Sequence, residues 1–335
     1  MTRAKLERLG LDLPLLPTTS VGSFPKPDEL VHARNNFVRG KIDEKQLDEH
    51  ERRATRFWIE TQEQLGVDVL VDGEQYRGDM VAYFAERLPG FATGGLVRSY
   101  GNRYYHKPIL TGEVRWPGPV TVEWWKFAQG LTKKPVKGML TGPYTLMDWS
   151  FNEHYPDRRS ACFALAGVVR SEVEALIAAG CKIIQVDEPA LSVRPEELGL
   201  AIEAMHRVTD SLEAYFVTHA CYGDFAAIYP AMLDLPVDNF DLEFANSDLD
   251  LLDLFLSHPF RKDLSFGVVD VHTHEMEDAA TVRRRIEKAL TLVPKEQLWI
   301  DPDCGLKTRS VDEAIAKLRA CVEAARAQRE ELVSH

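Results

Sequence analysis

KIIQVD, at residues 182–187, is a nearly continuous apolar run that ends in a carboxylate and precedes a helix-forming stretch. The same unit recurs in TTSVGS (18–23), VDVLVDG (67–73), PVKGMLTG (135–142), AYFVTH (214–219), FDLEF (240–244), SFGVVDVH (265–272) and LWIDPD (298–303). Such runs indicate strands that are buried on both faces of a parallel sheet, with the intervening helices as crossovers. Eight such units predict an α/β fold, a (β/α)8 TIM barrel.

Two regions depart from this alternation of strands and helices. Residues 28–65 are charged and helix-prone and are interrupted at Gly40, which predicts two helices between the first and second strands. Residues 76–134 hold several Pro-Gly turns and many aromatic residues, which predicts an ordered insertion after strand 2, beside the barrel mouth. We expect one catalytic barrel domain over residues 1–335, with an N-terminal helical extension.

Composition narrows the class of protein. The net charge of -12 argues against nucleic acid or an anionic membrane as a partner, because both require a basic surface. No apolar run approaches the roughly 18 residues of a membrane span, and the N-terminus lacks a secretory signal, so we expect a cytoplasmic protein. No G-x-G-x-x-G motif opens a helix, which removes the main dinucleotide-binding alternative.

The five cysteines fall into two groups. An odd number of cysteines in a long chain fits reduced thiols and metal ligation better than a disulfide framework. Cys162, Cys181 and Cys321 lie in apolar or helix-like surroundings and are expected to be buried small hydrophobic residues. Cys221 and Cys304 follow predicted strands, where a barrel collects its functional groups.

Four residues just past predicted strands offer two thiolates, an imidazole and a carboxylate: His219, Cys221, Glu243 and Cys304. This set matches tetrahedral zinc, and its origin in separate chain segments differs from the paired C-x-x-C knuckles of structural sites. The H-x-C spacing places both side chains on one face of an extended segment. Glu243 is expected either as the fourth ligand or as a residue that orients the ligands.

Other polar residues close the eight runs and join the same candidate site. They are Ser23, Asp72, Glu74, Asp187, Glu188, Asp270, His272, Asp301 and Asp303. Zinc with two thiolate ligands is a poorer Lewis acid than hydrolytic zinc, but it can hold a substrate thiol as a nucleophilic thiolate at neutral pH. The residues alone therefore favour alkyl transfer to a thiol, with zinc-assisted hydrolysis as the alternative.

Longer ordered motifs extend over nearly the whole chain, among them TTSVGSFP, GVDVLVDGE, KPVKGMLTGPYTLMDWSF, IIQVDEPAL, THACY, GVVDVH and WIDPDCGLKTR. With these motifs the sequence resembles the C-terminal catalytic barrel of the cobalamin-independent methionine synthases. The resemblance implies that His219, Cys221, Glu243 and Cys304 bind Zn²⁺, with Glu243 released when the homocysteine thiolate takes its place.

The resemblance also implies roles for residues around the metal. Val21, Ser23, Glu74 and Asp187 would hold the amino and carboxylate groups of homocysteine, since two carboxylates suit one ammonium. His272 would donate a proton to the departing folate nitrogen. The methyl donor would contact Arg103, Tyr104, Tyr105 and Trp149, where the Trp149 indole can stack on the pterin.

The natural methyl donor is the open question of the resemblance. The full-length family has a second, N-terminal barrel that helps to bind the folate tail, whereas only about 17 residues precede the first predicted strand here. We therefore expect a single-barrel form that uses either 5-methyltetrahydrofolate (poly)glutamate or methylcobalamin on a corrinoid protein. Alkyl transfer to coenzyme M is a further alternative, although Glu74 and Asp187 would repel its sulfonate. Two alternatives of another class remain. One is a docking partner of a corrinoid protein, in which the zinc holds an unknown thiol, and the other is a zinc hydrolase with Asp187 or Glu188 as the base.

Overall fold

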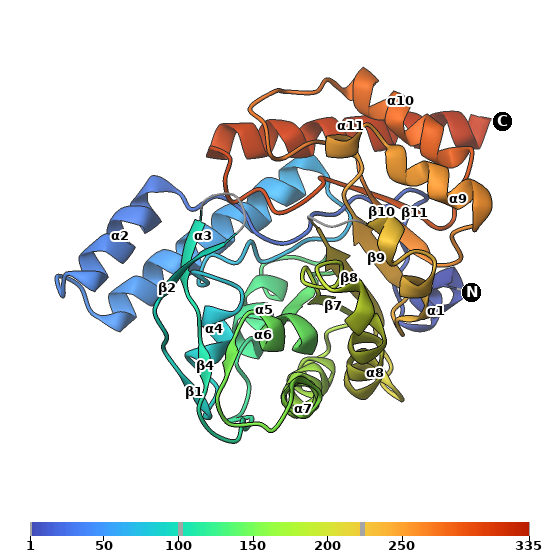
Figure 1. Ribbon diagram of the computed structural model, residues 1–335. Helices are drawn as coiled ribbons and strands as arrows, with labels where there is room; N and C mark the ends of the chain where they lie inside the picture. The colour runs from blue at the N-terminus through green and yellow to red at the C-terminus, as the bar shows by residue number, and fades with distance from the viewer. Residues whose placement is uncertain (1, 100–102, 222–224, 335) are drawn as a thin grey trace. The chain divides into compact units, whose positions relative to one another are not determined.

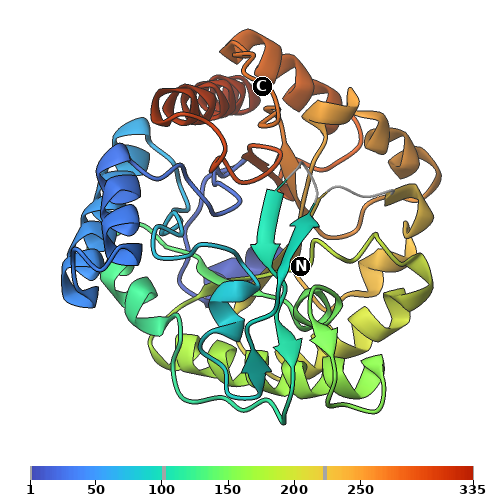
Figure 2. The same cartoon turned by 60° about the vertical axis from the view of Figure 1, so that its left-hand side comes forward.

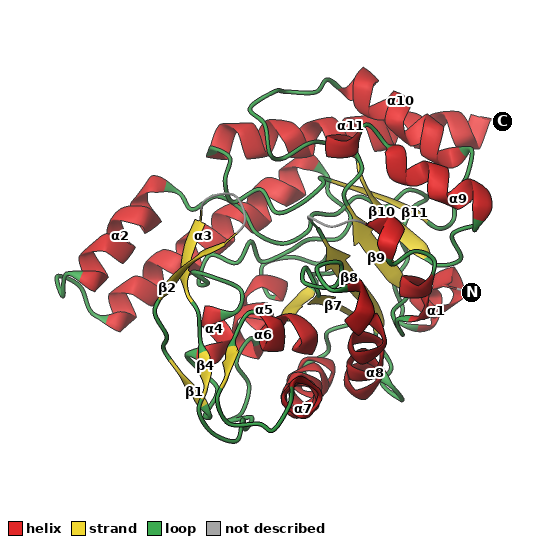
Figure 3. Cartoon of the chain, in the orientation of Figure 1, coloured by secondary structure: helices red, strands yellow, loops and turns green. Residues whose placement is uncertain are grey.

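The computed structural model describes residues 2–99, 103–221 and 225–334. Strands and helices alternate along much of the chain, as Figure 3 shows. Two compact units form: the first comprises Met1–Tyr76, Lys126–Lys137 and Asp241–His335, and the second comprises Arg77–Trp125 and Gly138–Phe240.

The main sheet has the strand order β11-β10-β9-β8-β7-β5. Its strands are β5 (Gly138–Thr141), β7 (Ile183–Asp187), β8 (Tyr215–Ala220), β9 (Asn239–Leu242), β10 (Asp263–Gly267) and β11 (Leu298–Asp301). β7 pairs in parallel with β5 and with β8, and β10 pairs in parallel with β11. All residues of these six strands are buried, as the apolar runs predicted.

The first two predicted strands appear as isolated parallel bridges instead of continuous ladders. Thr18 bridges to Ile300 of β11, Ser23 to Gly73, and Leu70 to Val136, which leads directly into β5. The eight predicted runs therefore follow one another in the order of a closed parallel sheet. The α/β, TIM-barrel prediction is confirmed.

Side chains explain why these two runs form bridges only. The Asp68 carboxylate accepts hydrogen bonds from the Thr18 amide and hydroxyl, both at 2.8 Å. The Gln62 side chain accepts from the Val71 amide at 3.0 Å and donates to the Val71 carbonyl at 2.8 Å. These polar groups replace the strand neighbour that a ladder would supply, so the buried backbone remains satisfied.

The helices of the first unit are α1 (Thr2–Arg8), α2 (Asp28–Val38), α3 (Glu44–Leu65), α9 (Leu254–Ser257), α10 (Ala279–Leu290) and α11 (Val311–Ser334). Figure 1 shows α2 beside α3, and Figure 2 shows the orange α10 beside the red α11. The predicted break at Gly40 lies between α2 and α3, where this glycine has φ +67°. A capping box at Asp43 begins α3, and left-handed Gly66 ends it.

The second unit contains most of the predicted insertion. Its helices are α4 (Ala82–Ala85), α6 (Pro143–Asp148), α7 (Arg158–Ala178) and α8 (Leu198–Thr209). Its short strands are β1 (Phe91–Ala92), β2 (Leu96–Ser99), β3 (Arg103–His106), β4 (Ile109–Leu110) and β6 (Phe151–Asn152). β2 and β3 form an antiparallel pair, whereas β4 lies between β1 and β6. Helix α5 (Val122–Gln129) also lies within residues 76–134 and precedes β5.

Short 3-10 turns complete the described structure. They are η2 (Pro195–Glu197), η3 (Phe225–Ala227), η4 (Ala231–Asp234), η5 (Ala245–Ser247) and η6 (Asp250–Asp253). None of the helices among the described residues has the length and apolar character that a bilayer crossing needs. None of the five cysteines, all of which the structure describes, forms a disulfide, and Cys162, Cys181 and Cys321 are buried as predicted.

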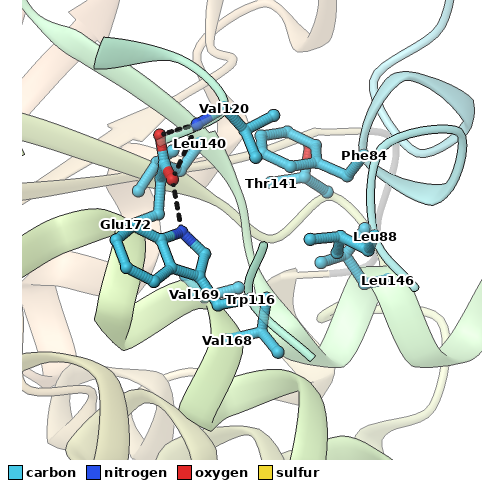
Figure 4. Close-up of a pocket in the computed structure, with 10 residues that line it drawn as sticks. All are labelled: Phe84, Leu88, Trp116, Val120, Leu140, Thr141, Leu146, Val168, Val169 and Glu172. Carbon is cyan, nitrogen blue, oxygen red and sulfur yellow. Dashed lines mark hydrogen bonds between the residues drawn. The ribbon is translucent and has the colours of Figure 1, made fainter. Parts of the chain in front are cut away.

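A buried carboxylate on α7 anchors the segment before α5. Glu172 accepts hydrogen bonds from the Trp116 indole at 2.7 Å and from the Val120 amide at 2.9 Å, as Figure 4 shows. The Thr121 amide and hydroxyl also donate to it, at 2.6 and 2.8 Å. Leu88, Val168 and other apolar side chains line the small pocket alongside. A carboxylate with this many donors is fully compensated for its burial, and it fixes residues 116–121 against α7.

Candidate functional site

Three of the predicted metal ligands lie close together. His219 is the penultimate residue of β8, Cys221 follows this strand, and Cys304 lies three residues past the end of β11. The ligand atoms of these three residues all lie within 4.8 Å of one another. His219 and Cys221 are buried, and Cys304 is half-buried. An imidazole and two thiols at this spacing form a donor set that suits a borderline or soft metal ion.

Glu243, the fourth predicted ligand, is held by two neighbours. It follows β9, is buried, and among the described residues it does not belong to the set within 4.8 Å. Its Oε1 lies 3.2 Å from His272 Nε2, and its Oε2 accepts a hydrogen bond from the Asn246 amide at 3.2 Å. Neither Asn246 nor this contact was predicted from the sequence.

His272 lies in a loop and not at a strand end. The predicted run 265–272 continues past the end of β10 at Gly267. Past Val268, two backbone amides bond to side chains: Glu277 accepts from the Asp270 amide at 2.9 Å, and Asp270 accepts from the His272 amide at 2.7 Å. Lys317 of α11 is buried and donates to the Asp270 carbonyl at 2.7 Å. These contacts hold the loop that carries His272.

The surroundings of His272 favour its protonated form. The hydrogen bond with Glu243 raises the pKa of the imidazole, and the nearby carboxylate and thiol charges act in the same direction. Burial opposes this shift. A protonated imidazole near neutral pH can act as a general acid, which is the role predicted for His272.

Asp303 connects the segments of Glu243 and Cys304. It is fully buried and immediately precedes Cys304. Its carboxylate accepts hydrogen bonds from the amides of Phe244, Ala245 and Asn246 at 3.0, 2.9 and 2.7 Å. Burial raises the pKa of Asp303 to about 7, against the effect of these three donors. The sequence had marked Asp303 only as one of many polar residues at strand ends.

Three of the predicted amino-acid contacts lie in the first unit. Ser23 bridges to Gly73, which places its backbone beside that of Glu74. Glu74 adopts a left-handed conformation with φ +54°, and its amide donates to Asp72 at 2.9 Å. Val21 is buried close by in the chain. The turn at residues 21–23 and the strained Glu74 backbone therefore lie on paired segments.

Lys26 places a half-buried cation beside this pair of segments. Its ammonium donates to the Glu74 carbonyl at 3.4 Å. Burial lowers the pKa of Lys26 to about 8, with a smaller contribution from Arg34 in the same direction, whereas Glu74 raises it. The sequence analysis had not singled out Lys26.

Asp187, the fourth predicted amino-acid contact, ends β7 in the second unit. One of its oxygens accepts from Gln185 Nε2 at 2.7 Å. The adjacent Glu188 is fully buried and accepts from the amides of Tyr144 and Thr145 at 3.0 and 2.7 Å and from the Thr145 hydroxyl at 2.7 Å. Glu188 thus caps the first turn of α6, and this structural role does not suit the base of a hydrolase.

The predicted donor contacts lie in two places of the second unit. Arg103, Tyr104 and Tyr105 form most of β3, and their backbones pair with β2, but their side chains lie outside what the structure describes. Trp149 is the C-cap of α6, where its amide donates to the Thr145 carbonyl at 2.9 Å. The Trp149 side chain is half-buried. Glu188 at one end of α6 and Trp149 at the other are therefore connected through a single short helix.

Comparison with known proteins finds relatives over nearly the whole chain. The relative from Bacillus licheniformis, named 5-methyltetrahydropteroyltriglutamate–homocysteine methyltransferase, is 42% identical over 98% of this chain and 45% of its own length. The protein of the same name from Streptomyces avermitilis is also 42% identical, over 98% of this chain and 44% of its own length. The chain thus spans about half the length of the curated relatives it matches.

Solved structures of shorter proteins match over their full length. A B12-independent methionine synthase from Shewanella sp. W3-18-1, solved in complex with selenomethionine, is 28% identical with a TM-score of 0.86. The alignment covers 96% of this chain and 100% of that one. A Listeria monocytogenes structure, at 24% identity and a TM-score of 0.77, has the same fold. The family model described as "Cobalamin-independent synthase, Catalytic domain" matches residues 16–327. This chain belongs to the cobalamin-independent methionine synthase family, of which it represents the catalytic domain.

Proposed function

We propose that this protein transfers a methyl group to the thiol of L-homocysteine and so forms L-methionine. The observation that carries the proposal is the imidazole and two thiols of His219, Cys221 and Cys304, whose ligand atoms lie within 4.8 Å of one another. A donor set of this kind is suited to binding a substrate thiol. The relatives named for homocysteine methylation support the same reaction.

We propose Zn²⁺ as the metal, held by His219, Cys221 and Cys304 with Glu243 as the exchangeable fourth group. When bound, the ion would lower the pKa of the substrate thiol, whose ordinary value is about 8.5, so that the sulfur is nucleophilic at neutral pH. Thiol and imidazole donors fit zinc. The contacts of Glu243 with Asn246 and His272 give its carboxylate a place to lie when it is not a ligand.

Glu74 and Asp187 would bind the ammonium of homocysteine, and the backbone of residues 21–23 would bind its carboxylate. Charge-assisted hydrogen bonds of this kind orient an amino acid in a fixed direction. The left-handed Glu74 backbone and the hydrogen bond from Gln185 to Asp187 keep both carboxylates in defined orientations. The Shewanella relative was solved with selenomethionine, the selenium analogue of the product, which agrees with an amino-acid site in the family.

The donor side is proposed at Trp149 and at residues 103–105, with His272 as the acid. A folate leaving group carries a nitrogen that must gain a proton, and the raised pKa of His272 favours its protonated form. A methyl-corrinoid protein is the alternative donor. A cobalt leaving group needs no proton, so the two donors place different demands on His272.

The test is methionine formation from homocysteine by zinc-loaded protein. Methyltetrahydrofolate, its triglutamate and free methylcobalamin are compared side by side, with a metal-free sample as the control. Methionine from any donor, dependent on zinc, supports the proposal. Activity with folates supports the roles of Trp149 and His272, and activity with methylcobalamin alone removes them. Hydrolysis without any thiol acceptor, and no methionine, would overturn the proposal.

A further inference from the structure

Asp303 connects the chain segments that carry two of the proposed metal ligands, Glu243 and Cys304. It is fully buried and lies next to Cys304 in the chain. Its carboxylate accepts three hydrogen bonds, all from the three consecutive amides that follow Glu243. The segment it holds is the turn η5 and the residue before it.

The contact continues from the backbone to the Glu243 side chain. Asp303 Oδ2 accepts from the Asn246 amide at 2.7 Å, and the Asn246 side chain in turn donates to Glu243 Oε2 at 3.2 Å. The other oxygen of Glu243 lies 3.2 Å from His272. A shift of the 244–246 segment would therefore move both the Cα of Glu243 and one of the two groups that hold its carboxylate.

The opposite side of Asp303 is fixed as tightly. Its own amide donates to the Val269 carbonyl at 3.0 Å. A Cβ added at Gly267 would clash with the Asp303 carboxylate and would lie 2.9 Å from the Leu242 carbonyl. Only glycine leaves room for the carboxylate at this point of β10. Asp303 is thus confined by β10 on one side and bonded to the Glu243 segment on the other.

We infer that Asp303 is a positioning residue that holds the Glu243 and Cys304 segments in a fixed register and thereby sets the metal affinity of the site. The inference rests on the proposed metal site. Groups that orient metal ligands commonly change metal affinity by about tenfold to a hundredfold when they are altered. Asp303 touches neither the substrate nor the reacting atoms in this assignment, and it acts through the backbone of its neighbours.

The experiment measures zinc affinity of the whole protein without substrate, by competition with a chromophoric chelator. Asp303→Asn keeps the size of the side chain but places an amide where the 244–246 amides need an acceptor. We expect zinc to bind about tenfold to a hundredfold more weakly. Cobalt(II) substituted for zinc should show an altered visible spectrum, which reports on ligand geometry and which a purely structural role would not change.

Glu172→Gln is the matched control. Glu172 is also a buried carboxylate that accepts backbone amides, but it anchors residues 116–121 to α7. Thermal unfolding of the metal-free proteins measures the loss of stability in both variants. A loss of stability in Glu172→Gln with unchanged zinc affinity supports a specific role for Asp303. Equal weakening of zinc binding in both variants would show a general effect of stability and overturn the inference.

Gly267→Ala is the second variant and changes no polar group. Because its methyl group presses on the Asp303 carboxylate, zinc should again bind more weakly and the cobalt spectrum should change. Folded Asp303→Asn with wild-type affinity and spectrum would overturn the inference. If Asp303→Asn does not fold, wild-type affinity and spectrum in Gly267→Ala would overturn it. Zinc affinity needs no methyl transfer, so a wild-type protein that binds zinc without forming methionine would contradict the proposed function alone.

Discussion

Glu188 and Asp303 are two buried carboxylates, one in each unit, that both accept hydrogen bonds from backbone amides. Each follows a strand of the sheet, is fully buried, and accepts three hydrogen bonds from the segment after another strand. Burial raises the pKa of each to about 7, although the hydrogen-bond donors oppose the shift. In both cases, a carboxylate replaces the partner that the first amides of a helical turn would otherwise lack.

The two carboxylates differ in what they hold. Glu188 adjoins Asp187 and caps α6, whose far end is Trp149, so its neighbours are the proposed amino-acid and donor contacts. Asp303 adjoins Cys304 and accepts hydrogen bonds from the segment after Glu243. The Glu243 side chain contacts His272. The same arrangement thus lies beside proposed substrate contacts, Asp187 and Trp149, in one case, and beside proposed metal ligands, Glu243 and Cys304, in the other. Substitutions near Asp303 should therefore affect metal binding and proton transfer, and substitutions near Glu188 should affect substrate binding.

The largest expected effect is the loss of metal beside Asp303. Cys304→Ser replaces a soft thiolate by a hydroxyl, which is a poor ligand for zinc, so bound zinc should fall sharply and methyl transfer should be abolished. Elemental analysis measures the bound zinc, and methionine formation measures methyl transfer. Cys162→Ser, at a buried thiol outside the proposed site, is the control and should keep its zinc. Full zinc and full activity in Cys304→Ser would remove this residue from the site.

The next effect concerns the acid that contacts Glu243. His272→Gln should lower the rate with a folate donor by about a hundredfold, because general-acid catalysis is commonly worth that much. With methylcobalamin the loss should be much smaller, since the leaving cobalt takes no proton. Initial rates with the two donors are compared in the same preparation. Equal losses with both donors would exclude the acid role and reduce His272 to a partner of Glu243.

A smaller effect is expected on the Glu188 side. Asp187→Asn removes a negative charge that we propose faces the substrate ammonium, and hydrogen bonds to charged groups contribute about 1.5 to 3 kcal/mol. The KM for homocysteine should rise about tenfold or more, while zinc content stays at the wild-type level. Steady-state kinetics test the predicted rise in KM, and elemental analysis tests the predicted zinc content. Loss of zinc together with unchanged KM would contradict the substrate-binding role of Asp187 and indicate a role in metal binding instead.

The smallest effect on methyl transfer is expected at Lys26, which tests how burial shifts the pKa of a positively charged side chain. Lys26 has a folded-state pKa of about 8, below its ordinary value of 10.5, so the folded protein binds fewer protons than the unfolded chain between these pH values. The free energy of unfolding should therefore gain a favourable contribution from Lys26 as the pH rises from 8 to 10.5. Because one pKa unit corresponds to about 1.4 kcal/mol, Lys26→Met should remove a change of about 3 kcal/mol from this profile.

Urea denaturation at several pH values between 7.5 and 10.5 measures that profile. Lys45→Met, at an exposed position of α3, is the control for loss of a lysine charge and should leave the profile unchanged. An identical pH dependence in wild type and Lys26→Met would show that burial does not shift Lys26.

Local sequence pattern predicted much of the architecture. The apolar runs became the buried strands β5, β7, β8, β9, β10 and β11, because continuous burial in a parallel sheet requires apolar residues at every position. The two helices around Gly40 were also predicted, since a glycine with positive φ ends a helical segment. The first two runs formed bridges only, because the side chains of Gln62 and Asp68 satisfy backbone groups of these runs.

For the site, the sequence by itself determined which atoms are available. The H-x-C spacing in an extended segment and a third ligand past another strand brought His219, Cys221 and Cys304 together, because parallel strands end at the same edge. Tertiary structure alone decided that Glu243 meets Asn246 and His272, and that Asp303 and Glu188 hold turns instead of facing substrate. Such contacts join residues up to 59 positions apart. A buried carboxylate needs hydrogen-bond donors, and only the folded chain brings donors that distant in sequence within reach.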